Sequence, residues 1–157
     1  MNNNLNIKKI KFNYKPDSVP YFYRLSYRAS LTCLILKISC RKNSACSLTK
    51  IHLITTSLYT EKEMQLLIKE VTNSNLYAIN LRFDPTVNKT MDFLLSEGIV
   101  SMRNNLRFFL TKKGEEFTEQ IINNPELLTK EKEFLSKLST NLTESKIGEI
   151  SNLLKMR

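Results

Sequence analysis

The sequence predicts a mainly α-helical protein with a small antiparallel sheet, arranged as a winged helix-turn-helix with extra N- and C-terminal helices. Apolar residues recur at three- and four-residue spacing along most of the 157 residues, which contain only three glycines and four prolines. An asparagine-rich turn also separates two short strand-like runs that lie between two helical patterns. A helix, a hairpin and a second helix in this order form the second half of a winged helix-turn-helix.

The helix before the hairpin begins at a clear start signal. Asp84 is a favourable N-cap, and Pro85 suits the first helical position because its missing N–H is not needed there. Apolar residues then follow at helical spacing from Val87 to Leu95. The helix is expected to end near Gly98, since glycine readily takes the left-handed conformation that terminates helices.

The hairpin and the helix after it complete this central stretch. The predicted strands are Ile99-Val100 and Leu106–Leu110, joined by the turn Arg103-Asn104-Asn105. Thr111 is expected to cap the next helix, Lys112–Ile122, whose apolar side chains fall on one face.

Further elements are predicted on both sides of this stretch. An apolar stripe predicts a long helix from Tyr21 to Cys40, and two shorter helices follow the N-cap signals Ser47 and Thr60. Alternating residues over Tyr77–Phe83 predict a strand that pairs with the hairpin. Apolar stripes over 127–138 and 147–154 predict two last helices, which either pack back on the domain or offer apolar faces to a partner.

The chain divides into three parts on this basis. Residues 1–18 are expected to be an N-terminal arm, residues 19–122 the winged-helix domain, and residues 123–157 a C-terminal helical extension. The longest apolar run is far shorter than the roughly 20 residues of a membrane-spanning helix, and the N-terminus lacks a secretion signal, so we expect a cytoplasmic protein with no membrane contact.

Charge is distributed unevenly along the chain. The formal net charge is +9, and residues 1–50 contain ten Lys or Arg but only one acidic residue, Asp17. Basic segments of this kind bind phosphates or acidic protein surfaces, or serve only as a solvated face.

No catalytic, metal or cofactor motif stands out in the sequence. The single histidine, His52, lies in an apolar helical pattern, where a packed side chain is far more common than a catalyst. The three cysteines do not form a Cys-x2-Cys pair, and their odd number fits free thiols. We therefore expect a non-enzymatic binding protein without cofactor or metal.

Nucleic-acid contact is one alternative for its binding role. In DNA-binding winged helices the helix before the hairpin enters the major groove and the wing touches the backbone. Asp92 and Glu97 on this helix would repel phosphates, whereas the hairpin region is basic and has no acid. The candidate nucleic-acid residues are Asn88, Lys89, Arg103, Arg107, Lys112 and Lys113.

Several short runs together resemble a known family. They are Leu81–Met91 (LRFDPTVNKTM), Leu95–Val100 (LSEGIV) and Leu110–Gly114 (LTKKG). The chain thereby resembles the small middle component of bacterial three-component ABC-ATPase defence systems of the Lamassu type. The resemblance covers roughly residues 76–122, and its most particular part is Arg82–Asn88, whereas the other two runs are common among winged helices.

The resemblance implies a non-enzymatic adaptor. Such a subunit joins an SMC- or Rad50-like ATPase to a nuclease-like effector in defence against phage and plasmids, and double-stranded DNA is a further contact reached through the complex. The basic N-terminal half and the C-terminal apolar helices are the expected docking surfaces, with candidate residues Arg24, Arg28, Leu135, Leu138, Ile150 and Leu153. The alternative is a winged-helix transcriptional regulator that binds DNA itself.

Overall fold

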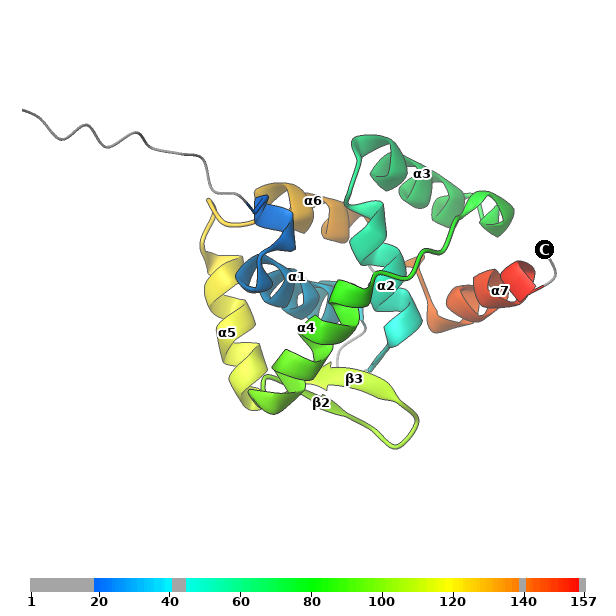
Figure 1. Cartoon of the computed structure of the whole chain (residues 1–157). Coiled ribbons are helices and arrows are strands. Elements are labelled where there is room, and N and C mark those ends of the chain that lie inside the picture. The colour runs from blue at the N-terminus through cyan, green and yellow to red at the C-terminus, as the bar shows by residue number, and fades with distance from the viewer. Residues whose placement is uncertain (1–18, 41–44, 139–140, 156–157) are drawn as a thin grey trace, which may run out of the picture.

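The computed structural model describes residues 19–40, 45–138 and 141–155. The expected N-terminal arm, residues 1–18, lies outside the described residues. The described chain is mainly helical and carries a small three-stranded antiparallel sheet (Figure 1). Its α-helices are α1 (Leu25–Ile38), α2 (Leu48–Ser57), α3 (Glu61–Thr72), α4 (Pro85–Ser96), α5 (Lys112–Asn123), α6 (Thr129–Leu138) and α7 (Glu144–Lys155).

Helix α1 lies at the centre of the fold. Its residues from Arg28 to Leu36 are buried almost without interruption, as expected of a helix that is apolar around most of its circumference. Helices α2, α4, α5 and α6 all pack against it (Figure 1). The helix begins at Leu25 and not at Tyr21, because Tyr21–Tyr23 form the separate 3-10 turn η1.

Four predicted helix caps are confirmed. The side chains of Ser47, Thr60, Asp84 and Thr111 each accept a hydrogen bond from a backbone N–H in the first turn of α2, α3, α4 and α5, respectively. These bonds satisfy amide groups that have no partner within the helix. Gly98 also takes the predicted left-handed conformation after α4, with φ of 64°.

The predicted hairpin is confirmed as strands β2 (Val100–Met102) and β3 (Arg107–Leu110). They pair antiparallel, with Val100 opposite Leu110. The third strand is β1 (Cys46–Ser47), which places Cys46 opposite Phe108, so the strand order is β1-β3-β2.

The predicted strand over Tyr77–Phe83 is wrong. Leu76–Ala78 form the 3-10 turn η2, and residues 79–84 run to α4 in no regular strand. Ile79 and Leu81 are buried, but Tyr77 and Phe83 of the same alternation are each 67% exposed, so the predicted buried side is only partly present. Such a pattern does not specify a hydrogen-bonded neighbour, and β1 occupies the free side of β3.

The last two helices pack back on the rest of the chain. Helix α6 lies against α1 and α3, and α7 lies against α2 and η2. One hydrophobic core therefore includes residues on both sides of the expected boundary at residue 123. None of the helices in the described part of the chain is long and apolar enough to cross a lipid bilayer.

Candidate functional site

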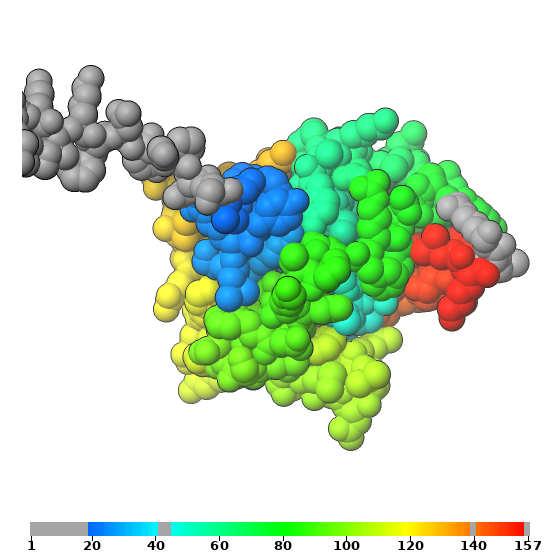
Figure 2. Space-filling model, viewed as in Figure 1, coloured from blue at the N-terminus to red at the C-terminus, as the bar shows by residue number. Residues whose placement is uncertain are grey.

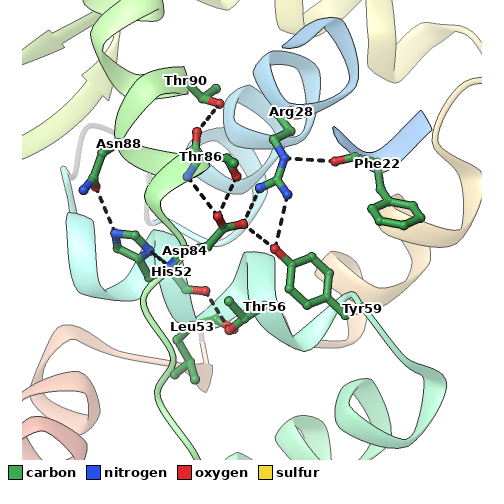
Figure 3. Close-up of polar contacts among 10 residues, drawn as sticks. All are labelled: Phe22, Arg28, His52, Leu53, Thr56, Tyr59, Asp84, Thr86, Asn88 and Thr90. Carbon is green, nitrogen blue, oxygen red and sulfur yellow. Dashed lines mark hydrogen bonds and ion pairs between the residues drawn. The ribbon is translucent and has the colours of Figure 1, made fainter. Parts of the chain in front are cut away.

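A cluster of polar side chains joins α1, α2 and the start of α4 at Asp84 (Figure 3). One carboxylate oxygen of Asp84 accepts hydrogen bonds from the backbone N–H and the hydroxyl of Thr86, at 2.8 and 2.7 Å. The other oxygen accepts from Nη1 of Arg28 at 2.7 Å and from the hydroxyl of Tyr59. Asp84 is thus both the cap of α4 and one half of an ion pair.

Arg28 is the buried cation of this pair, with only 3% of its surface exposed. Besides Asp84, its guanidinium donates to the carbonyl of Phe22 at 2.9 Å and to the hydroxyl of Tyr59 at 3.2 Å. Burial by itself lowers the pKa of the guanidinium, but the bonds to Tyr59 and Asp84 outweigh it and raise the pKa. Arg28 therefore stays charged and holds η1 on the fold.

The Asp84 carboxyl is strongly stabilised as an anion. Burial by itself raises its pKa, but hydrogen bonds from Tyr59, Thr86 and Arg28 outweigh burial and hold the pKa well below its usual range. A buried ion pair with all its polar atoms bonded fixes the relative position of the elements that carry it. Here those elements are α1, the end of α2 and α4.

His52 extends the cluster on the other side of Asp84. Its Nδ1 accepts the backbone N–H of Asp84 at 3.1 Å, so the neutral ring carries its proton on Nε2 and donates it to Oδ1 of Asn88, also at 3.1 Å. Burial lowers the pKa of His52, and the contacts with Asn88 and Asp84 oppose this only in part. The histidine is a neutral connector between α2 and α4.

Two of the candidate nucleic-acid residues, Asn88 and Lys113, make polar contacts within the chain. The amide of Asn88 is bound to His52 (Figure 3), while Lys89 is exposed on the first half of α4. Lys113 binds the carbonyl of Glu97 at 2.7 Å, at the other end of α4 and about 12 Å from Lys89 along the helix axis.

Two of the wing cations are engaged within the chain. Arg107 lies 3.9 Å from a carboxylate oxygen of Glu144, and the guanidinium of Arg103 lies 5.3 Å from the centre of the Phe109 ring. Lys112 is exposed at the start of α5. The hairpin tip and the α5 start remain the most basic part of the predicted interface.

The candidate partner-binding residues need correction. Arg28, Leu135, Leu138 and Ile150 are buried in this chain, because α6 and α7 pack back on the core and Arg28 pairs with Asp84. They therefore cannot line an exposed docking face in this structure. Leu153 is half-buried against the core, and Arg24 is exposed and donates to the carbonyl of Val19.

A group of exposed aromatic side chains lies beside the polar cluster or on η1. We call it the aromatic rim, and it consists of Tyr21, Tyr23, Tyr59 and Phe83. Figure 2 shows their segments, the N-terminal part of the described chain in blue and the approach to α4 in green, on one face of the molecule.

Three members of the aromatic rim contact the polar cluster, whereas Tyr21 packs edge-on against Phe22 and Tyr27. The Tyr23 ring lies 5.7 Å from the Arg28 guanidinium, Tyr59 bonds to both charged residues, and Phe83 contacts His52 edge-on at 5.1 Å.

Sequence reasoning did not find the aromatic rim. It assigned the start of the first helix to the core and Phe83 to the buried side of a strand, yet Phe83 is 67% exposed. The run Tyr21-Phe22-Tyr23 was the available signal, because three successive aromatic residues cannot all face one side of a helix.

Comparisons with known proteins add no family to this picture. No family model matches the chain, and the comparisons with curated proteins and with solved structures give no match either. Within the described residues, no three His, Cys, Asp or Glu side chains lie close enough together to hold a metal ion.

Proposed function

We propose that this chain is a non-enzymatic adaptor subunit of a bacterial anti-phage and anti-plasmid defence complex. Its partners are an SMC- or Rad50-like ATPase and a nuclease-like effector, as the resemblance of the Arg82–Asn88 stretch implies. The chain acts by contact, and double-stranded DNA is reached through the complex.

The order of elements supports a winged helix as the scaffold of this adaptor. Helix α1, strand β1 and helix α2 are followed by α4 and the β2–β3 hairpin, and the strand order is β1-β3-β2. Helix α3 and the segment after it are additions before α4. A hairpin that follows the last helix of such a unit is the wing.

The aromatic rim is the observation that best supports the adaptor role. Tyrosine and arginine are enriched among the residues that dominate protein–protein binding energy, and they act best where their neighbours are fixed in place. Tyr23, Tyr59 and Phe83 are exposed, yet each contacts a member of the buried cluster. A partner meets these rings in fixed positions, so little conformational entropy is lost on binding.

The particular motif of the resemblance builds this surface. Asp84 and Pro85 start α4, Asn88 binds His52, and Phe83 stands exposed beside them. Arg82 is half exposed and pairs with Glu63 at 2.9 Å. The same stretch therefore connects the start of α4 with α2 and contributes one exposed aromatic side chain, Phe83.

Co-expression tests the proposal directly. The tagged chain, expressed with the products of the neighbouring ATPase and effector genes, is expected to co-purify and co-elute with them. The double variant Tyr23→Ser and Phe83→Ser is expected to keep its melting temperature but lose the partners, since both side chains are exposed. Leu106→Ser, which changes an exposed leucine at the hairpin tip, is the matched control. Elution of free wild-type chain alone would rule out the adaptor role.

A winged-helix transcriptional regulator is the second candidate, favoured by the exposed cations Arg103 and Lys112 near the wing. It requires binding to upstream DNA that is much tighter than binding to random DNA and that weakens steeply with salt. Two features of α4 oppose base reading, namely the engaged amide of Asn88 and the acid Asp92. Equal retention of both DNAs in a competition assay would exclude the regulator and leave the adaptor role unaffected.

A further inference from the structure

Two of the three cysteines meet at the junction between α1 and α2. Cys40 comes two residues after the end of α1 and is half-buried, whereas Cys46 lies in β1 and is fully buried. Both are free thiols, and a hydrogen bond joins their side chains. This contact places the two sulfurs next to each other, which is the first requirement for a disulfide.

Lys50 holds this junction together from the first turn of α2. Its ammonium donates a hydrogen bond to the carbonyl of Ser39 at 2.7 Å, and its backbone N–H donates to the Oγ of Ser47 at 3.2 Å. Ser39 precedes Cys40 in the chain, and Ser47 follows Cys46. The chain neighbours of both cysteines are therefore anchored to one residue, which keeps the two thiols side by side.

The Lys50 ammonium is also a buried cation without a carboxylate partner. Lys50 is only 3% exposed, and no carboxylate in the described part of the chain forms an ion pair with it. Glu144 of α7 faces this junction but instead accepts the backbone N–H of Ser47 at 3.0 Å and lies 3.9 Å from Arg107 of β3. Since buried charges are normally paired, a thiolate at Cys40 would supply the missing counter-charge.

The two thiols differ in how readily they lose a proton. The hydrogen bond from Cys46 is the largest influence on Cys40 and lowers the pKa of its thiol. The positive charges of Lys50 and Arg107 act in the same direction, whereas burial and Glu144 oppose them. The pKa of Cys46 is raised, first by its hydrogen bond to Cys40 and then by burial. Cys40 is thus the nucleophile of the pair, and Cys46 keeps the proton.

Cys33 provides a reference within the same chain. It is fully buried in α1, and its side chain is hydrogen-bonded to Thr118 of α5. Burial raises the pKa of the Cys33 thiol to about 12. A buried thiol of this kind reacts slowly, because the thiolate is the nucleophilic form.

We propose that Cys40 and Cys46 form a hydroperoxide-reactive dithiol site, in which Cys40 attacks the peroxide and Cys46 resolves the product. The Cys40 thiolate attacks one peroxide oxygen, the O–O bond breaks, and the leaving alkoxide or hydroxide takes up the proton that Cys40 released. Cys46 then attacks the sulfur of the Cys40 sulfenic acid, so that the S–S bond forms, the S–O bond breaks, and the hydroxyl group leaves with the Cys46 proton as water.

The products of this reaction affect the fold locally. The two thiols lose two electrons in total, which reduce the hydroperoxide, and an external dithiol can return them. The disulfide would link the chain after α1 to β1, which pairs with β3 of the hairpin. The proposal does not depend on the adaptor role.

Mass spectrometry of the full chain tests the site. After hydrogen peroxide treatment of the folded protein, the wild type is expected to lose about 2 Da and to keep one alkylatable thiol of its three cysteines after denaturation. Trypsin is then expected to release residues 38–41 joined to residues 43–50, a link that dithiothreitol breaks. Cys40→Ser is expected to lose thiols about tenfold more slowly, whereas Cys33→Ala, the matched control, forms the disulfide at the wild-type rate.

Two further measurements separate the roles of the thiols. Cys46→Ser is expected to accumulate a sulfenic acid at Cys40 that dimedone traps, whereas Cys40→Ser gives no such adduct. Iodoacetamide labelling of Cys40 in the folded protein is expected to have its pH midpoint below the ordinary value of about 8.5. A wild-type chain that does not lose about 2 Da, a disulfide that contains Cys33, or a Cys40 thiol oxidised no faster than Cys33 would overturn the proposal.

Discussion

Gly114 is the position at which a single methyl group is expected to be most damaging. It lies in the first turn of α5, directly against the backbone at the start of the hairpin. A Cβ at residue 114 would lie 2.1 Å from the carbonyl oxygen of Ile99, well below the 3.0 Å that real Cβ contacts respect. That oxygen is held in place, because it accepts both the backbone N–H and the hydroxyl of Thr111, at 3.0 and 3.1 Å.

The size of the effect follows from these contacts. Replacement of glycine by alanine inside a helix normally stabilises by about 1 kcal/mol. Here the helix and the hairpin must separate by about 1 Å, which costs about 1–3 kcal/mol of overpacking. The two hydrogen bonds to the Ile99 oxygen are worth about 1 kcal/mol each and are strained by the same shift. We therefore expect Gly114→Ala to lower the free energy of unfolding by about 2–4 kcal/mol.

Urea unfolding followed by circular dichroism measures this difference. The matched control is Gly148→Ala in α7, where a Cβ would meet nothing within 4 Å. This control is expected to raise the free energy of unfolding by about 0.5–1 kcal/mol, from the helix preference of alanine alone. A Gly114→Ala protein as stable as the wild type would refute the close approach of α5 to Ile99.

The remaining predictions concern the polar cluster, the wing and the core. Asp84→Asn leaves Arg28 buried without its counter-charge and is expected to lower the free energy of unfolding by about 3–5 kcal/mol in the same assay. Burial lowers the pKa of His52 below the ordinary value of about 6.5, so its contribution to stability is complete above pH 6.5. This contribution is lost as the pH falls from about 6.5 toward the lowered pKa. His52→Gln is expected to remove this pH dependence, as measured by unfolding curves at about pH 7.5 and 5.5. Leu106, 68% exposed, has φ of 57° at the hairpin turn, and Leu106→Asn is expected to raise the melting temperature through a gain of about 0.5–1 kcal/mol, because asparagine tolerates this conformation better. Leu94→Ala is expected to cost about 2–5 kcal/mol, since Leu94 is fully buried, and a wild-type melting curve would contradict its place in the core.

Local signals in the sequence predicted the helices well. The caps Ser47, Thr60, Asp84 and Thr111 all act as expected, since a cap requires only the three residues that follow it. The hairpin was also predicted, because its turn and its two strands are adjacent in the chain.

The incorrect predictions all concern contacts between residues that lie far apart in the sequence. The burial of Arg28 results from Asp84, which lies 56 residues away in the chain. The third strand is β1, which pairs with β3 about 60 residues later in the chain. The alternating segment Tyr77–Phe83 forms no strand and pairs with none. Apolar stripes on α6 and α7 could equally have faced a partner, and only packing against α1, α2 and α3 assigns them to the core.

The amino-acid sequence alone therefore determined where α2, α3, α4 and α5 begin and where the hairpin turns, because hydrogen bonds and apolar spacing within a few residues decide those points. Tertiary structure decided which faces of those helices stay exposed. The Arg28–Asp84 ion pair draws η1, α2 and α4 together, and this assembly alone leaves Tyr23, Tyr59 and Phe83 on the surface. No pattern along the chain encodes that surface, since it is made from segments that meet only after folding.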